Sequence, residues 1–134
     1  MKKIIFSILF LVSAAISQAQ SHRIVFQLSS EDTLVHKALM KNIAHVLQLA
    51  PDAKVEVVCH GPGLSMLVQE KSMVQSRIHE LAGKGVAFVA CEFTMKERNV
   101  TKDKLVTDAG TVPGGIMEIV KKQEEGWSYI KPGF

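Results

Sequence analysis

Residues 22–59 read HRIVFQLSSEDTLVHKALMKNIAHVLQLAPDAKVEVVC, and this stretch decides the fold. It begins with a β-branched apolar run, residues 22–28, which predicts a buried strand. Residues 29–32 supply capping and acidic side chains, so a helix should begin there and continue, with apolar side chains at three- and four-residue steps, until Pro51 ends it. A second apolar run, residues 54–59, predicts the next strand. A strand–helix–strand unit with a right-handed crossover places its two strands parallel.

The same alternation continues to the C-terminus. Residues 60–63, His-Gly-Pro-Gly, are typical of a turn. A helix over 74–82 and a third strand over 86–90 follow, and this strand runs directly into Cys91. Residues 95–108 are polar, with one or two helical turns near 102–107. A brief strand at 111–112, a helix over 116–125 and a last strand over 127–130 complete the pattern. We therefore expect an α/β fold with a doubly wound, mainly parallel sheet of about five strands and helices on both faces.

The first nineteen residues have the features of a signal peptide. Lys2 and Lys3 precede an apolar run over 4–16, and Ser17 and Ala19 place small residues where signal peptidase cuts. The run is shorter than the ~20 residues that a helix needs to span a bilayer, although an uncleaved anchor is the alternative. We expect cleavage after Ala19, one domain over 20–134, export to a bacterial periplasm, and no membrane association after cleavage.

Composition excludes several classes of protein. Of the 134 residues, 47% are hydrophobic and 22% are charged, which is typical of a folded globular domain. Removing Lys2 and Lys3 from the 16 basic residues leaves 14 against 13 acidic ones, so the domain has no electrostatic footprint for nucleic acid. Two cysteines are too few for a disulfide scaffold or a structural zinc site. Gly61 and Gly63 belong to no phosphate-binding motif. We therefore expect no metal and no cofactor.

Cys91 and His60 are the candidate site residues. In doubly wound sheets the site lies at the carboxyl ends of the strands, where residues 29–32, 59–63 and 91–94 are all expected. Cys91 would lie near helix N-termini, which favour the nucleophilic thiolate, although buried cysteine is also an ordinary core residue. His60 would act as a base or stabilise the thiolate, unless it is a solvated loop residue. Ser29 and Asp32 are better explained as helix-capping residues.

Cys59 has three interpretations: a core residue, a resolving thiol, or a disulfide partner of Cys91. If the first strand lies between the second and third, those two are separated by about 9.6 Å, twice the ~4.8 Å strand spacing. This exceeds the ~7 Å limit on the Cα separation of a disulfide. We therefore expect Cys59 to lie in the core, while a curled loop end would still allow the pairing.

Four stretches of the chain carry a family resemblance. They are HGPGL at 60–64, GVAFVACE at 85–92, VPGG at 112–115 and, most specific, KQEEGWSYIKP at 122–132. On these stretches the chain resembles the DsrE/DsrF-like family, as an exported member. The resemblance implies a flavodoxin-like fold and assembly into trimers or hexamers. In sulfur-oxidising and tRNA-thiolating relatives a cysteine after the third strand carries sulfur as a persulfide, and Cys91 matches that position.

Two functions from different classes follow as hypotheses. The first is a periplasmic sulfur carrier, at most sulfurtransferase-like, that holds a persulfide on Cys91 and exchanges it with donor and acceptor proteins. The alternative is a non-catalytic, oligomeric module that binds a small ligand and leaves Cys91 inert. A thiol–disulfide protein using Cys59 and Cys91 is a weaker third option, because the chain has no Cys-x-x-Cys motif.

Overall fold

The computed structural model describes residues 21–133. Five strands form one sheet in the order β4-β3-β2-β1-β5, and every neighbouring pair is parallel. The strands are β1 (Arg23–Leu28), β2 (Lys54–Cys59), β3 (Ala87–Cys91), β4 (Ala109–Val112) and β5 (Ser128–Ile130). The expected α/β fold of flavodoxin-like arrangement is confirmed. The predicted signal peptide, residues 1–19, lies outside the described residues.

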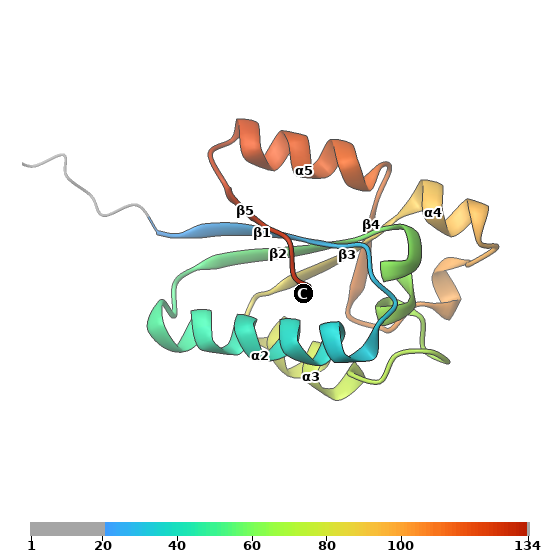
Figure 1. Ribbon diagram of the computed structural model, residues 1–134, viewed down its shortest axis with the longest axis horizontal. Coiled ribbons are helices and arrows are strands. Elements are labelled where there is room, and N and C mark those ends of the chain that lie inside the picture. The colour runs from blue at the N-terminus through green and yellow to red at the C-terminus, as the bar shows by residue number, and fades with distance from the viewer. Residues whose placement is uncertain (1–20, 134) are drawn as a thin grey trace, which may run out of the picture.

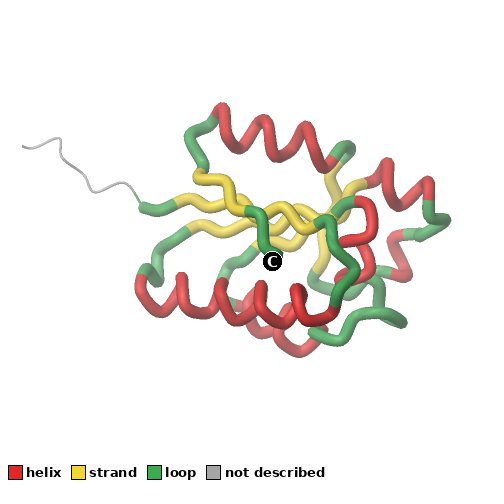
Figure 2. The backbone as a smooth tube through the Cα atoms, viewed as in Figure 1, coloured by secondary structure: helices red, strands yellow, loops and turns green. Residues whose placement is uncertain are grey.

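Helices cover both faces of the sheet, but unequally (Figures 1 and 2). Helices α2 (Thr33–Leu49) and α3 (Gln75–Gly83) lie on one face, and α5 (Gly115–Glu124) lies on the other. The short helix α4 (Glu92–Glu97) follows β3 directly, and two 3₁₀ segments, η2 (Gly61–Leu67) and η3 (Lys102–Lys104), complete the connections. None of the helices in residues 21–133 is both long and apolar enough to cross a membrane.

The two faces bury very different amounts of apolar surface. The α2/α3 face contributes to a core of 22 buried residues, which includes Phe26, Leu39 and Phe88. The α5 face has a cluster of three buried residues, Val25, Val58 and Ile119. Because side chains alternate along a strand, β1 contributes Phe26 to one core and Val25 to the other. The large core therefore supplies most of the apolar burial that stabilises the fold.

The strand order corrects one sequence-based assumption. The first strand does not separate the second from the third, because β2 pairs with β3 and the Cα partner of Cys59 is Ala90. Ala90 lies in the large core with Cys59, so the next residue, Cys91, faces α5. Both cysteines are free thiols. Their orientation on opposite faces, rather than the spacing of the strands, is what opposes a disulfide.

Two local structures differ from the prediction. Helix α4 lies where no helix was expected at 92–97, because six residues are too few to show a periodic apolar pattern. It ends at Glu97, and Asn99, just beyond the C-cap Arg98, has a left-handed φ of 52°. Val100 N–H then donates to Met95 O at 2.8 Å, which closes the end of the helix. The His-Gly-Pro-Gly turn continues as η2. A Cβ on Gly63 would lie 2.2 Å from the Leu28 carbonyl oxygen, so this glycine allows a close approach of two backbones.

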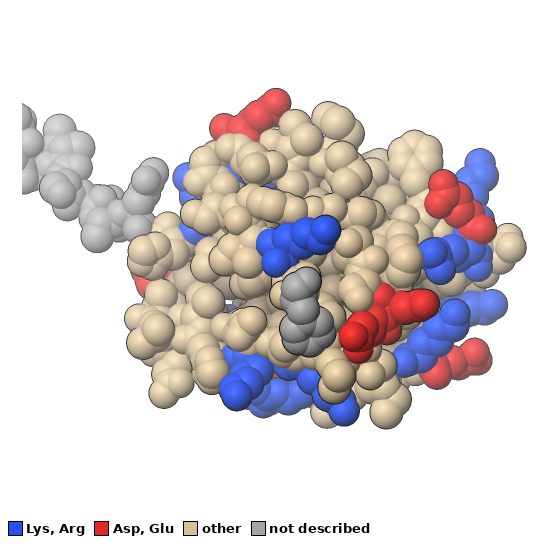
Figure 3. Space-filling view, in the orientation of Figure 1, with Lys and Arg blue, Asp and Glu red and all other residues tan. Residues whose placement is uncertain are grey.

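Figure 3 shows basic and acidic side chains interspersed over the visible face of the molecule. That face carries no broad region in which all charged side chains have the same sign. Electrostatic steering of a highly charged partner would require such a region.

Candidate functional site

The connections that follow β2, β3 and β4 converge around one thiol. Cys91 is the last residue of β3 and the N-cap of α4, and His60 follows β2. Gly114 and Gly115 follow β4 and begin α5. These four residues line one pocket of about 260 Å³. The structure therefore brings the two sequence-predicted residues, Cys91 and His60, into the same pocket at the carboxyl edge of the sheet.

The N-terminus of α5 contacts the thiol directly. The backbone N–H of Gly115 donates a hydrogen bond to Cys91 Sγ, with 3.2 Å between nitrogen and sulfur. A Cβ on Gly115 would lie 3.1 Å from His60 Cβ and 3.2 Å from both Cys91 Cβ and Val58 Cγ1. The missing side chain therefore allows α5 to approach the thiol this closely. The first N–H groups of a helix carry partial positive charge and stabilise an anion placed against them.

The surroundings of Cys91 favour its thiolate. Cys91 is 5% exposed, and this burial alone would raise the pKa of the thiol. Hydrogen bonds from the backbone N–H groups of Thr94, Gly115 and Phe93 and from the Thr94 hydroxyl outweigh burial, so the pKa lies below its ordinary value. A lowered pKa is what a nucleophilic thiol requires near neutral pH.

Thr94 is a site residue that the sequence placed at this edge of the sheet, within residues 91–94, but that it did not single out. It is buried, and its Oγ1 accepts a hydrogen bond from Gly61 N–H at 3.0 Å. Because this bond occupies a lone pair of Oγ1, the hydroxyl proton remains free to stabilise the Cys91 thiolate. The sequence signal for this role was the position of Thr94, three residues after Cys91 in the first turn of the helix that Cys91 caps.

His60 is held by a polar chain that begins on β5. The Tyr129 hydroxyl donates to Gln27 Oε1, and Gln27 Nε2 lies 2.8 Å from His60 Nε2. An amide nitrogen only donates, so His60 Nε2 accepts and the ring proton lies on Nδ1. Burial, with the nearby positive charge of Lys131, lowers the pKa of His60 and favours the neutral ring. Within residues 21–133 no hydrogen bond joins this ring to Cys91 Sγ.

Cys59 lies in the opposite environment. It is completely buried in the large apolar core, and burial raises the pKa of its thiol far above the ordinary value. This position agrees with the expected core role. The same chain therefore holds two thiols whose pKa values are shifted in opposite directions.

The other residues considered from sequence have structural roles. Asp32 is the N-cap of α2, and its Oδ1 accepts from Leu34 N–H at 2.8 Å, as predicted. Ser30, rather than Ser29, supports this cap by accepting from Asp32 N–H at 3.1 Å. In the described part of the chain, no group of three or more His, Cys, Asp or Glu side chains is arranged to hold a metal ion.

Apolar side chains surround the pocket mouth. Phe93 is 68% exposed, Ile116 55% and Met117 60%, and all three line the pocket that contains Cys91. Gly114 lies beside this rim, because a Cβ added to it would be 3.5 Å from the Phe93 ring. The Cys91 thiol therefore lies in a small pocket that is lined by these exposed apolar side chains together with the exposed Glu97.

Comparison with known proteins gives a family and a fold. A model of the DsrE/DsrF-like family matches residues 7–132. MTH1491, a protein of unknown function from Methanobacterium thermoautotrophicum, is 31% identical with a TM-score of 0.79, over 83% of this chain and 99% of that one. The ychN protein from E. coli (13% identity, TM-score 0.65, 82% and 98% covered) shares the fold. BT1422, a protein of unknown function from Bacteroides thetaiotaomicron, also shares the fold, with 13% identity and a TM-score of 0.66 over 85% of this chain and 99% of that one. No curated protein matches the sequence.

Proposed function

The chain belongs to the DsrE/DsrF-like family, and from this membership and the thiol site we propose that it is a sulfur carrier with a persulfide on Cys91. The observation that carries the proposal is the set of N–H groups around Cys91 Sγ, with Gly115 N–H at 3.2 Å. Donors aimed at a sulfur stabilise it as an anion, which is the form that attacks and the form that leaves. Cys59 has no comparable environment, since it is fully buried in the apolar core.

The proposed transfer proceeds in two balanced steps. Cys91 thiolate attacks the outer sulfur of a donor persulfide, R–S–SH, the donor S–S bond breaks, and the donor leaves as the thiolate R–S⁻. The product is Cys91–S–SH, so one sulfur atom has moved without net oxidation or reduction. An acceptor thiolate then attacks the outer sulfur of this persulfide, and Cys91 leaves as a thiolate. Gly115 N–H stabilises Cys91 sulfur in both steps.

The proposed partners are donor and acceptor proteins. The apolar rim of Phe93, Ile116 and Met117 supports this, because exposed apolar side chains grouped around a reactive atom are typical of a protein contact. We also propose a homo-oligomer, a trimer or hexamer, as the family resemblance implies. The periplasmic location is proposed from the sequence of residues 1–19 alone.

We assign His60 a second, smaller role. Its Nε2 is occupied by Gln27, which leaves Nδ1–H as the group available to donate to sulfur held in the pocket. His60→Ala removes this donor, whereas His60→Asn retains an N–H donor near the position of Nδ1. We expect His60→Ala to slow sulfur transfer several-fold and His60→Asn to slow it less. Equal rates in both variants and the wild type would remove His60 from the proposal.

The alternative function is an oligomeric module that binds a small ligand and leaves Cys91 inert. It is supported by the low exposure of Cys91, 5%, because a buried cysteine can be an ordinary core residue. The size of the pocket favours the carrier instead. Its volume of about 260 Å³ lies just below the roughly 300–1,000 Å³ of typical small-molecule sites. A sulfur atom added to Cys91 needs much less space than that.

Intact-mass measurement after exposure to polysulfide tests the proposal. The protein is incubated with polysulfide, alkylated and weighed, beside the Cys91→Ser and Cys59→Ala variants. The proposal predicts a mass gain of one sulfur atom in the wild type and Cys59→Ala, and no gain in Cys91→Ser. A folded wild type that gains no sulfur, or a gain that persists in Cys91→Ser, would contradict the carrier and favour the small-ligand module.

A further inference from the structure

The face of α5 that contacts the sheet is poor in apolar side chains. Gly115, Glu118, Ile119 and Lys122 lie at positions i, i+3, i+4 and i+7, so they share one side of the helix. Of these four, Ile119 is the only large apolar residue; it clusters with two buried valines of β1 and β2, and the partly buried Val89 and Trp127 pack against this cluster. One side chain does not fix both the position and the tilt of a helix. Another contact must determine where its N-terminus lies.

That contact is an ion pair between the sheet and the helix. Glu56 of β2 is 7% exposed, and Lys122 Nζ lies 3.1 Å from its Oε2. Lys122 Nζ also lies 3.7 Å from Glu118 Oε1 and 4.4 Å from the centre of the Trp127 ring. Glu56 Oε1 is buried and has no hydrogen-bond partner among residues 21–133. The contact between Oε2 and Lys122 Nζ therefore compensates this carboxylate for the water that it loses on burial. A buried carboxylate that loses its cation is costly, and this cost resists movement of Lys122.

The ion pair and the thiol contact lie at opposite ends of α5. Lys122 is seven residues after Gly115, which is about 10 Å along the helix axis at the 1.5 Å rise per residue. Both ends meet the same strand, because Gly115 packs against Val58 and Lys122 pairs with Glu56. Helix α5 is therefore held on β2 by an ion pair at one end and by the close approach of Gly115 at the other.

We propose that Glu56 and Lys122 are positioning residues, whose partly buried ion pair fixes α5 on the sheet and so keeps Gly115 N–H within hydrogen-bonding distance of Cys91 Sγ. The inference rests on the proposed function, because it assigns how the reactive state of the same thiol is maintained. It does not make either residue catalytic, since neither contacts the pocket that contains Cys91.

The test is the pKa of Cys91, measured from the ultraviolet absorbance of its thiolate as a function of pH. Cys59 does not interfere, because burial raises the pKa of its thiol above the range measured. We expect Lys122→Met to raise the pKa of Cys91 by about one unit, which is about ten-fold less thiolate at a given pH below it. Lys122→Arg retains the cation and should restore most of the wild-type value.

Lys121→Met is the matched control. It removes the same charge from the preceding residue of α5, where the side chain is largely exposed. A direct effect of helix charge on the thiol would appear in Lys121→Met, whereas loss of positioning would appear only in Lys122→Met. Equal shifts in the two variants, or no shift in a folded Lys122→Met, would overturn the inference.

If Lys122→Met does not fold, Glu56→Gln replaces it. This variant keeps the size of the side chain and weakens the pair, so we expect the Gly115 amide to exchange with solvent faster than in the wild type. Unchanged exchange would overturn the inference. Sulfur loading of the wild type is measured separately: if it fails while the pKa responds to Lys122→Met, the carrier function is wrong and the positioning role stands.

Discussion

The two cysteines lie at the ends of neighbouring strands, yet they lie in contrasting environments. Cys59 points into the 22-residue core, where burial alone acts and raises the pKa of its thiol. Cys91 points toward α5, where Gly115 N–H and Thr94 outweigh burial and lower the pKa. The two cysteines therefore differ because they point to opposite faces of the sheet: Cys59 is a core residue, and Cys91 is a candidate nucleophile. The hydrogen-bond donors around a thiol, more than its exposure, distinguish the two.

The same contrast separates the two faces as a whole. The α2/α3 face is closely packed with apolar side chains, which stabilise the fold. The α5 face has a cluster of three buried apolar residues beside a partly buried ion pair and the thiol pocket. The following substitutions act on one face at a time, so they test whether stability and thiol reactivity can be changed separately.

The largest effect on stability is expected in the large core. Leu39 of α2 is completely buried there, and Leu39→Ala should reduce the free energy of unfolding by about 2–5 kcal/mol. The pKa of Cys91 should remain unchanged in the folded variant. Urea denaturation measures the first quantity and thiolate absorbance the second. A pKa that shifts together with stability would show that the faces are not independent.

Gly115→Ala should have a smaller effect on stability and a larger one on the thiol. Its Cβ would lie within 3.2 Å of atoms in Val58, His60 and Cys91, all close to the backbone, so α5 must move outward. We expect a loss of about 1–3 kcal/mol, as for other overpacked sites, and a raised pKa of Cys91. Gly114→Ala is the matched control, because a Cβ there meets the Phe93 ring at an ordinary 3.5 Å. Identical behaviour of the two variants would contradict the role of Gly115.

The pH dependence of stability should have opposite signs for the two thiols. Cys91 has a lowered pKa in the folded state, so the unfolded state binds more protons and Cys91 adds stability as pH rises from its folded pKa toward the ordinary value near 9.0. Cys59 has a raised pKa, so it reduces stability above that value. Below about pH 9.0, the urea midpoint should therefore rise less with pH in Cys91→Ser than in the wild type. Above about pH 9.0, it should fall less with pH in Cys59→Ala than in the wild type. The same sign in both variants would refute the contrast.

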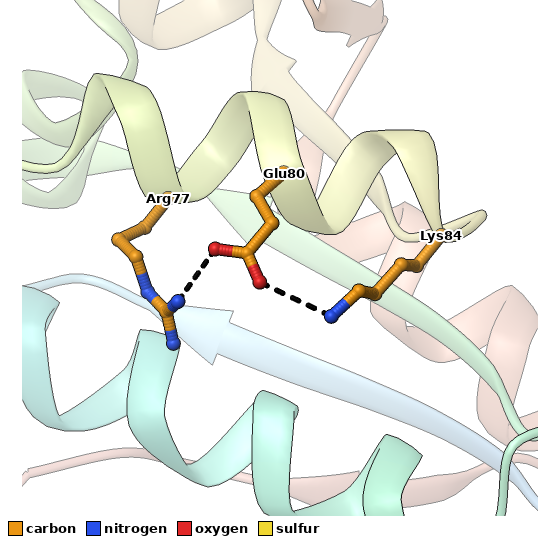
Figure 4. A network of polar contacts seen from close by, with 3 residues as sticks. All are labelled: Arg77, Glu80 and Lys84. Atoms are coloured by element: carbon orange, nitrogen blue, oxygen red, sulfur yellow. Dashed lines mark hydrogen bonds and ion pairs between the residues drawn. The ribbon is translucent and has the colours of Figure 1, made fainter.

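The smallest effect is expected on the solvent side of α3. Arg77, Glu80 and Lys84 form the exposed network in Figure 4, with Lys84 Nζ 3.1 Å from Glu80 Oε1. Exposed pairs are screened by water and contribute little, in contrast to the partly buried pair of Glu56 and Lys122. Glu80→Gln should leave both the urea midpoint and the pKa of Cys91 at their wild-type values. A lower urea midpoint would mean that the exposed network stabilises the fold, and a shifted pKa of Cys91 would mean that surface charge on this helix affects the thiol.

Much of the fold could be predicted because its signals are local. The apolar runs at 22–28, 54–59 and 86–90 predicted β1, β2 and β3, and Pro51 predicted the end of α2. Strand order depends on pairing between distant segments, and there the assumed central position of β1 was wrong. Helix α4 was missed because it is too short for a periodic pattern.

The candidate site was predictable in position but not in its physical basis. The place of Cys91 and His60 after two parallel strands predicted that they would meet at one edge of the sheet. The contacts of Gly115 and Lys122 could not be inferred, because they depend on how α5 packs across β2. Neither a glycine at a helix start nor a lysine near a helix end indicates such a contact by itself.

We propose that Cys91, and not Cys59, is the reactive thiol of the folded protein. The most direct test of this claim is the alkylation rate of each cysteine at neutral pH, resolved by peptide mass in the folded chain. The structure predicts that Cys91 is modified in the native state, while Cys59 is modified only as fast as the protein unfolds. Equal rates, or a Cys91 that also reacts only on unfolding, would contradict the claim.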